Sequence, residues 1–213
     1  MNVLLGIIGH SPVLENYPLG PILMKNLEGR HWDEINIDIE NMTWSPIHVV
    51  QRLQDLNLKY DRAILVGVSA KCNYPGKVWS YKWTGGFIPE VKVQERIYEG
   101  VTGVVSLDNT LVIGDYFKIW PEEIFTVEVE MHPDTFGEIV IAEDLGDSRK
   151  EKLKTLIGFD PVETRDSIEN IAYMLGCFGN NAFPDILEKK AQDIHHPELF
   201  IQNSFITKSP TLN

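Results

Sequence analysis

The residues with the clearest chemical potential follow an apolar run near the N-terminus. His10, Ser11, Glu15 and Asn16 come after Val3–Ile8, which has the composition of a strand buried on both faces. Ligands of open α/β sheets bind beyond the carboxyl ends of the strands, so these side chains are candidates for a site. A plainer interpretation stays open, because Ser11 and Asn16 can cap the next helix and Glu15 can complement its dipole.

A second polar loop follows another buried run, Ala63–Val68, and contains Ser69, Lys71 and Cys72. Lys71 is the one neighbour able to activate the Cys72 thiol, although a buried inert thiol is the commoner state of a free cysteine. The only other cysteine is Cys177, which leaves neither a disulfide framework nor a CxxC metal pair. A reducing, cytoplasmic location is therefore expected.

Several common catalytic motifs are missing. The glycines near the first apolar run do not form GxGxxG, and no GxxxxGK[ST] occurs, so a phosphate-binding loop is not indicated. Gly9-His10-Ser11 is not a GxSxG nucleophile turn. His195 and His196 lack the HExxH spacing of a zinc helix, which favours a surface role for them.

Composition narrows the classes of partner. The chain has 213 residues, 19 Lys and Arg against 31 Asp and Glu, and a formal net charge of −12. Nucleic acid and acidic membranes are disfavoured as partners, because both are bound mainly through cationic side chains. The start MNVLLGIIGH has no positively charged leader region, and no apolar stretch approaches the ~20 residues of a membrane span.

Apolar strands alternate with helical patterns along the first part of the chain. After Val3–Ile8 come a helical pattern at Leu19–Leu27, an alternating edge strand at Ile35–Ile39, a second helical pattern and Ala63–Val68. The turn Pro75-Gly76 leaves no room for a crossover, so the strand Val78–Trp83 should be antiparallel to its neighbour. We expect a three-layer α/β/α sandwich with a mostly parallel five-stranded sheet, one antiparallel strand, and Val3–Ile8 at its centre.

The later elements are less regular. Leu107–Ile119 and Pro161–Cys177 read as helices, and Ile124–Met131 reads as the last strand of the sheet. Residues 88–105 are ambiguous. Asp185–Ile194 is compatible with a short helix, and the remaining residues to Asn213 with an extended tail.

Five segments, in this order, carry a resemblance to a known family: LLGIIGHSPVLENYPLGPILMKNLEG, YDRAILVGVSAKCNYPGKVW, SLDNTLVIGDYF, WPEEIFTVEVEMHP and FDPVETRDSIENIAYML. The arrangement resembles the hydrogenase maturation proteases, endopeptidases that trim the C-terminus of nickel-iron hydrogenase large subunits. The resemblance covers residues 1–177 as one α/β domain. Residues 178–213 are then a C-terminal extension that packs on the domain or projects from it.

The resemblance implies a divalent-metal site, associated with nickel. The family's ligands are an acid in the first loop, an Asp ending the third strand and a His opening a later helix. By position these fall at Glu15, at Gly67 or its neighbours, none of which is acidic, and at Asp108. Carboxylates suit harder ions than nickel, which favours imidazole. Candidate substitute ligands or site-lining residues are His10, Ser69, Cys72, Glu130 and His132.

Two functional hypotheses follow from this resemblance. The first is a metal-dependent endopeptidase that processes a nickel-iron hydrogenase large-subunit precursor with an altered ligand set. The second is a noncatalytic relative that binds a precursor or partner protein without cleaving it. A small-molecule-binding α/β domain of unrelated function is a third interpretation, since fold does not fix function. We expect Glu15, Ser69 and Asp108 to lie near one another at the carboxyl edge of the sheet, because the first two follow adjacent parallel strands and the third opens a helix on the same rim.

Overall fold

The computed structural model describes residues 1–56, 59–144 and 146–194, and its strands form one six-stranded sheet. The order across the sheet is β2-β1-β3-β5-β4-β6. The first three neighbouring pairs are parallel, β4 is antiparallel to β5, and β6 runs parallel to β4. The strands are β1 (Asn2–Ile7), β2 (Asn36–Asn41), β3 (Arg62–Val68), β4 (Val78–Trp83), β5 (Glu123–Val129) and β6 (Leu187–Lys189).

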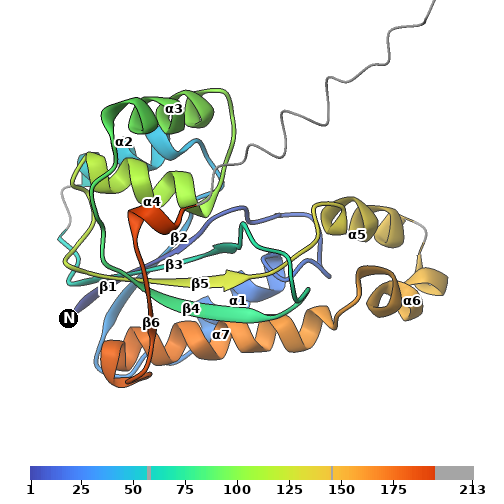
Figure 1. Ribbon diagram of the computed structural model, residues 1–213. Helices are drawn as coiled ribbons and strands as arrows, with labels where there is room; N and C mark the ends of the chain where they lie inside the picture. The colour runs from blue at the N-terminus through green and yellow to red at the C-terminus, as the bar shows by residue number, and fades with distance from the viewer. Residues whose placement is uncertain (57–58, 145, 195–213) are drawn as a thin grey trace, which may run out of the picture.

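Helices cover both faces of the sheet, which confirms the three-layer α/β/α sandwich (Figure 1). One face carries α2 (Pro46–Leu56), α3 (Glu90–Val101) and α4 (Leu107–Tyr116), and the other carries α1 (Pro21–Gly29) and α7 (Pro161–Phe178). The pair α5 (Thr135–Asp144) and α6 (Asp147–Ile157) lies beyond the end of β5, and the short 3-10 turns are η1 (Gly179–Asn181) and η2 (Ala191–Asp193). Within the described ranges, no helix is both long and apolar enough to cross a membrane.

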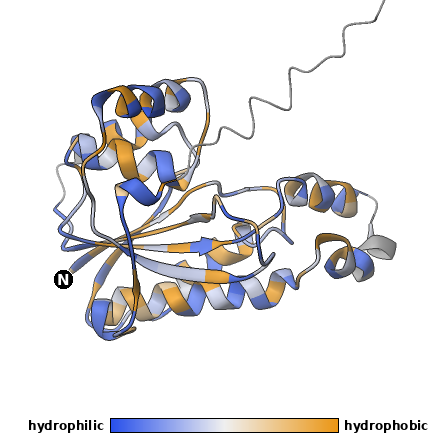
Figure 2. Ribbon diagram, viewed as in Figure 1, coloured by the Kyte–Doolittle hydropathy of each residue, from blue (hydrophilic) through white to orange (hydrophobic). Residues whose placement is uncertain are grey.

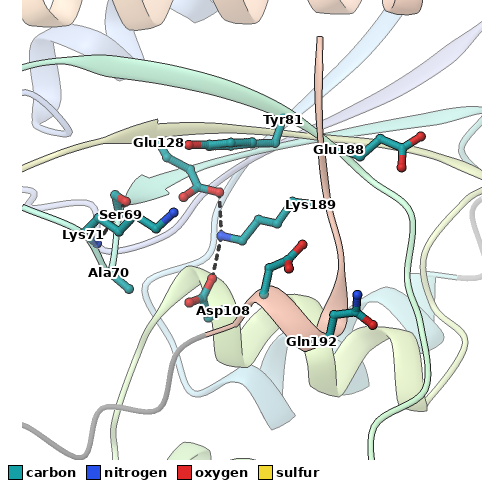
Figure 3. Close-up of a pocket in the computed structure, with 10 residues that line it drawn as sticks. Ser69, Ala70, Lys71, Tyr81, Asp108, Glu128, Glu188, Lys189 and Gln192 are labelled. Atoms are coloured by element: carbon teal, nitrogen blue, oxygen red, sulfur yellow. Dashed lines mark hydrogen bonds and ion pairs between the residues drawn. The ribbon is translucent and has the colours of Figure 1, made fainter.

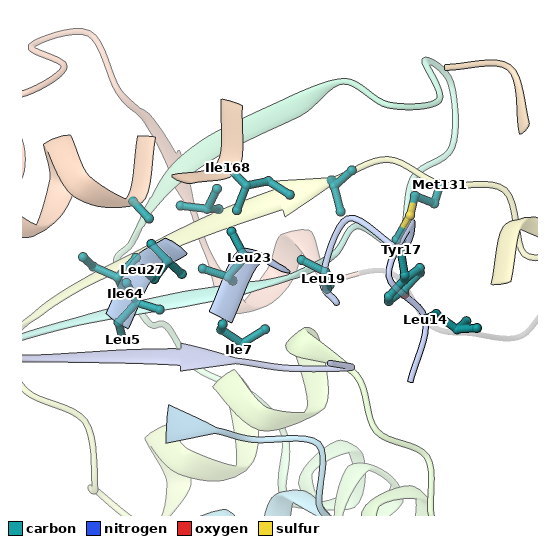
Figure 4. Packing of buried hydrophobic residues seen from close by; sticks show 14 of the residues in the cluster. Leu5, Ile7, Leu14, Tyr17, Leu19, Leu23, Leu27, Ile64, Met131 and Ile168 are labelled. Carbon is teal, nitrogen blue, oxygen red and sulfur yellow. The ribbon is translucent and has the colours of Figure 1, made fainter. Parts of the chain in front are cut away.

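The strands build the core because alternate side chains of one strand face opposite helical layers. Val3, Leu5 and Ile7 of β1 belong to the cluster on the side of α1 and α7, whereas Leu4 belongs to the cluster on the other side. Burial on both faces explains why β1 reads as a continuous apolar run. Figure 4 shows the first of these clusters, and Figure 2 shows polar and apolar residues interleaved along the covering helices.

The sheet and the segment that follows α7 differ from the prediction of a five-stranded sheet in three respects. β1 is not central, because β3, β5, β4 and β6 all lie on the same side of it. Ile124–Met131 does not contain the last strand, since β6 adds a sixth strand beside β4. The helix predicted for Asp185–Ile194 is wrong: the segment bonds to β4 and to the Gly85 carbonyl, and these bonds replace the helical ones. The predicted tail beyond residue 194 lies outside the described residues.

The turn between β3 and β4 holds the reversal that the sequence predicted. Gly76 has a φ of +80°, and its amide donates to the Glu130 carbonyl at 2.7 Å. A Cβ at this position would lie 2.4 Å from Cβ of Phe159, so the close approach and the positive φ both require glycine. The turn therefore fixes both the direction of β4 and the path of the loop that precedes it.

We expect Gly76→Ala to lower the free energy of unfolding by about 2–5 kcal/mol, from about 1–2 for the positive φ and about 1–3 for overpacking. Gly158→Ala is the matched control. Gly158 also has a φ of +80°, but a Cβ added there would meet no atom within 4 Å apart from its chain neighbours. The free energy of unfolding of Gly158→Ala should fall only by the cost of the positive φ, about 1–2 kcal/mol. Urea denaturation of both variants measures the difference, and equal losses would contradict the packing argument.

Candidate functional site

A cavity of about 310 Å³ lies at the carboxyl ends of β3 and β5, on the side of α4 (Figure 3). Ser69 and Lys71 come from the loop after β3, Asp108 from the start of α4 and Glu128 from β5. The opposite wall comes from β6 and the turn after it. The lining residues are Ser69, Ala70, Lys71, Tyr81, Asp108, Glu128, Glu188, Lys189, Gln192 and Asp193.

The centre of this cavity is an ion triad. Nζ of Lys189 lies 2.8 Å from Oδ1 of Asp108 and 2.7 Å from Oε1 of Glu128. The three side chains are only 11%, 10% and 4% exposed, respectively. Figure 3 shows the ammonium between the two carboxylates, with the Tyr81 ring nearby. The pair of acids is thus occupied by a cation from the protein itself.

Asp108 is held in place by a well-capped helix. The side chain of Ser106 accepts from the Asn109 amide at 3.1 Å and caps α4. The Asn109 side chain is fully buried and bonds to Arg96 and Glu99 of α3. Asp108 therefore sits in the first turn of a helix that is fixed from both sides, where a negative charge is also stabilised by the helix dipole.

Glu128 lies on β5 beside Gly67 of β3. In the β3·β5 register Gly67 stands directly opposite Glu128, so the two positions are neighbours on one face of the sheet. A Cβ on Gly67 would lie 3.1 Å from Cβ of Leu107, closer than ordinary contact. The glycine lets α4 approach β3, and the carboxylate comes from the next strand.

Lys189 is delivered by the edge strand β6. It pairs with Trp83 in the parallel β4·β6 register, and its carbonyl accepts from the Thr84 amide at 3.0 Å. Two residues later, the Ala191 amide donates to the Gly85 carbonyl at 2.9 Å, and the Ala191 side chain is buried in the core. These backbone bonds place the lysine stem across the carboxyl edge of the sheet.

The charge state of Lys189 follows from its surroundings. Burial lowers the pKa of its ammonium, but attraction and hydrogen bonds from Asp108 and Glu128 outweigh burial, so the pKa is raised above its usual value. The side chain keeps its proton at neutral pH. It therefore acts as a fixed positive charge and hydrogen-bond donor, and cannot serve as a general base.

The donor set does not fit a divalent metal. An ammonium offers only hydrogens, and it already occupies the space between the two carboxylates that could bind a cation. Glu15 is exposed in the loop after β1 and does not line the cavity, although Ser69 and Asp108 both do. In the described part of the chain, no three His, Cys, Asp or Glu side chains are grouped to hold a metal ion.

Glu130 and His132 do not line the cavity that contains the ion triad. The buried Glu130 carboxylate accepts from the amides of Asn73 and Tyr74 at 2.5 and 2.7 Å, and from the Trp79 indole at 2.7 Å. Glu130 thus anchors the loop before β4. His132 is largely exposed, with Nδ1 3.7 Å from Oδ2 of Asp134.

A second cavity of about 250 Å³ lies across the same edge, on the side of α1 and α5. Cys72 and His132 line it, and Ser69 and Ala70 line both cavities. Burial and the nearby charge of Glu130 raise the pKa of the Cys72 thiol, which makes it a poor nucleophile. The remaining lining residues are Tyr17, Val68, Met131, Pro133, Thr135 and Phe136.

His10 is a buried, neutral side chain beside the carboxyl end of β1. The Asn41 oxygen accepts from the Thr43 amide at 3.1 Å, so the Asn41 amide group faces Nδ1 of His10 at 3.2 Å and donates to it. The ring hydrogen is then on Nε2, which makes no hydrogen bond of standard length and angle among the described residues. Burial lowers the pKa of His10, and the Gly20 carbonyl offsets only part of this effect.

Ser11 and Asn16 do not cap α1, although their residue types allow it. The N-cap of α1 is Gly20, without a side-chain cap. The Ser11 hydroxyl accepts from the Leu14 amide within the loop, at 3.3 Å. Asn16 donates from its backbone and its side chain to Oε1 of Glu143 in α5, at 2.7 and 3.0 Å. This loop is therefore tied to α5, away from the ion triad.

Sequence reasoning missed two of the three residues in the triad. Glu128 had a detectable signal, because Thr126, Glu128 and Glu130 alternate with apolar residues in a strand that is otherwise buried. Buried acids in such a strand need a partner. Lys189 had no comparable signal, since it lies in an ordinary charged run, Glu188-Lys189-Lys190.

We expect Lys189→Met to lower the free energy of unfolding by about 3–5 kcal/mol, because it leaves two buried carboxylates without their cation. Lys190→Met is the matched control, since Lys190 is half-exposed and, within the part of the chain that the structure describes, pairs with the exposed Glu188; it should cost no more than about 0.5 kcal/mol. Adding Asp108→Asn and Glu128→Gln to Lys189→Met should recover much of the loss. Equal losses in the two single variants, measured by urea denaturation, would contradict a buried triad.

We expect the stability of the protein to fall as the pH drops below about 6.5, in part through His10. The folded ring has the lower pKa, so the unfolded chain binds its proton first and acid favours unfolding. His10→Gln should flatten the profile by at most about 1.4 kcal/mol per pH unit. The exposed His31→Gln serves as control. Urea midpoints from pH 8 to 5 test this, and an unchanged slope in His10→Gln would reject it.

Neither a protein-family model nor a curated protein sequence matches the chain. Solved structures that it resembles include the endopeptidase HycI from Escherichia coli, with 14% identity and a TM-score of 0.46 over 91% of this chain and 99% of that one. A mutant pyrrolidone carboxyl peptidase from Pyrococcus furiosus has 14% identity and a TM-score of 0.38, over 80% and 99% of the chains. A hydrogenase 2 maturation peptidase from a Thaumarchaeota archaeon has 13% identity and a TM-score of 0.33, over 68% and 99%. Hydrogenase maturation peptidases are thus among the structural neighbours, at low identity.

Proposed function

We propose that this chain is a divergent relative of the hydrogenase maturation proteases that binds a polypeptide without cleaving it. Its partner in this proposal is the C-terminal region of a nickel-iron hydrogenase large-subunit precursor in the cytoplasm, or a related protein segment. The order of the five resembling segments over residues 1–177 supports the lineage. The ion triad supports the loss of cleavage.

The Lys189 ammonium between Asp108 and Glu128 carries the proposal. Asp108 stands where the resemblance places a metal ligand, and Glu128 lies beside Gly67, the other such position. A dication about 4 Å from the ammonium would be repelled by about 8 kcal/mol at an effective dielectric of about 20. The site thus satisfies its two acids internally, whereas metal binding needs free oxygen acceptors.

The segment that supplies this lysine lies outside the family-like part. Residues 178–213 are, in this proposal, an extension added to a domain of residues 1–177, and Lys189 belongs to the extension. The altered ligand set and the added cation are then linked. Glu128 on β5 replaces the acid that is missing at Gly67 on β3, and Lys189 of the extension neutralises Glu128.

The neighbouring groups do not replace the metal as a means of cleavage. Cys72 has a raised pKa, and its thiol stays protonated near neutral pH. The Ser69 hydroxyl accepts from the Lys71 amide at 3.2 Å, and Lys189 holds its proton, so the lysine cannot deprotonate a serine. Two adjoining cavities that share Ser69 and Ala70 offer a polar and a more apolar surface for a bound polypeptide.

We expect the protein to bind a nickel-loaded large-subunit precursor from the same organism and to release no C-terminal peptide, because its two acids are already neutralised. Mass spectrometry follows the peptide, and co-elution on a sizing column measures binding. In a calorimetric titration, nickel alone should show no dissociation constant below about 1 µM, the range in which a preformed ligand set would bind. Stoichiometric release that is lost in Glu15→Ala would establish an active protease, and failure to co-elute would reject the precursor as partner.

A further inference from the structure

We propose that the edge of β4 and the Asp108–Glu128 pair form a docking site for an extended polypeptide segment that carries a lysine, and that β6 is its exchangeable internal occupant. This inference rests on the proposed function, because it names the kind of segment that a non-cleaving binder would take up. In it, the partner strand pairs with β4 and places its own ammonium between the two carboxylates.

β6 is a small element for the position it holds. It has three residues, against six or seven in each other strand, and it pairs only with Tyr81–Trp83 of β4. Leu187 is 56% exposed and contributes little to the core. The contacts that keep β6 against β4 therefore come mostly from Lys189, from the backbone hydrogen bonds beside it and from Ala191. Short edge segments with few buried contacts open at a lower free energy than the rest of the fold.

The edge of β4 offers more pairing than β6 uses. β4 extends over six residues, and among the described residues its outer edge is paired over only the last three. Beside the first three lies a groove of about 410 Å³, lined by Val78, Trp79 and Ser80 of β4, by Ile171 of α7 and by residues 182–187. An incoming parallel strand of six residues can pair along the whole edge and cover this groove. Strand addition of this kind supplies affinity through the main chain.

The carboxylate pair of Asp108 and Glu128 makes the docking site specific for a segment that carries a cation. If β6 alone withdraws, Asp108 and Glu128 lose the ammonium that pairs with both of them, which is unfavourable. Withdrawal is therefore favourable only when another cation enters, so the site exchanges one lysine for another. A lysine suits the space, because its single Nζ reaches both oxygens at 2.7–2.8 Å and lies 5.9 Å from the centroid of the Tyr81 ring.

The test uses the full-length chain and a fluorescent peptide with the sequence of residues 184–194, PDILEKKAQDI. Lys189→Ala removes the internal side chain, so this variant should bind the peptide about 10- to 100-fold more tightly than the wild type does. A control peptide with norleucine in place of the lysine at position 189 keeps the stem and removes the charge. It should bind the variant about 10- to 100-fold more weakly than the lysine peptide does.

A measurement on the wild type covers the case in which Lys189→Ala does not fold. The amides of Thr84 and Ala191, which bond to Lys189 and Gly85, should exchange hydrogen at least about tenfold faster than the Ser69 amide, which bonds to Val129 between β3 and β5. Excess lysine peptide should shift the NMR signals of Thr84 and Ala191, and the norleucine peptide should not.

Equal binding of the two peptides, or exchange of Thr84 and Ala191 only through global unfolding, would overturn the inference. Because the probe is this chain's own segment, such a result leaves binding of a hydrogenase precursor undecided and rejects only strand exchange. Conversely, a precursor that fails to co-elute leaves the exchange at β4 intact.

Discussion

The arrangement at the carboxyl edge of the sheet depends on one buried ammonium between two buried carboxylates. Asp108, Glu128 and Lys189 come from a helix, a central strand and an edge strand that are far apart in the chain. Each acid would be costly to bury alone, and the lysine offsets both costs while forming two charge-assisted hydrogen bonds. The triad therefore fixes how α4, β5 and β6 meet.

The end of β5 and the residue just after it show how two buried acids in a similar sequence context come to have different partners. Glu128 bonds to Lys189 and to the Thr126 hydroxyl, whereas Glu130, two residues later, bonds to two backbone amides and the Trp79 indole. One acid is part of an ion site and the other organises a loop. Both are satisfied, but only the first is held by a group that another cation could replace.

Glycine positions complete the geometry of the site. Gly67 allows Leu107, and with it the start of α4, to approach β3, which brings Asp108 near the acid on β5. Gly76 reverses the chain into β4, whose outer edge then receives β6. A side chain at Gly67 would displace the start of α4, which carries Asp108, and one at Gly76 would meet Phe159 and disturb the turn that leads into β4. The ion site is thus a consequence of backbone packing as well as of charge.

The layers of the fold can be predicted from the amino-acid sequence, because apolar periodicity is local and each strand or helix carries its own pattern. The sequence also placed Ser69 and Asp108 at one edge, since the carboxyl ends of parallel strands coincide. Three features of the site are visible only in the folded chain: Glu128 stands beside Gly67, Glu130 faces a loop, and Lys189 fills the space between two acids. These outcomes depend on the register between strands distant in the chain, and no local pattern encodes which lysine of a charged run becomes buried.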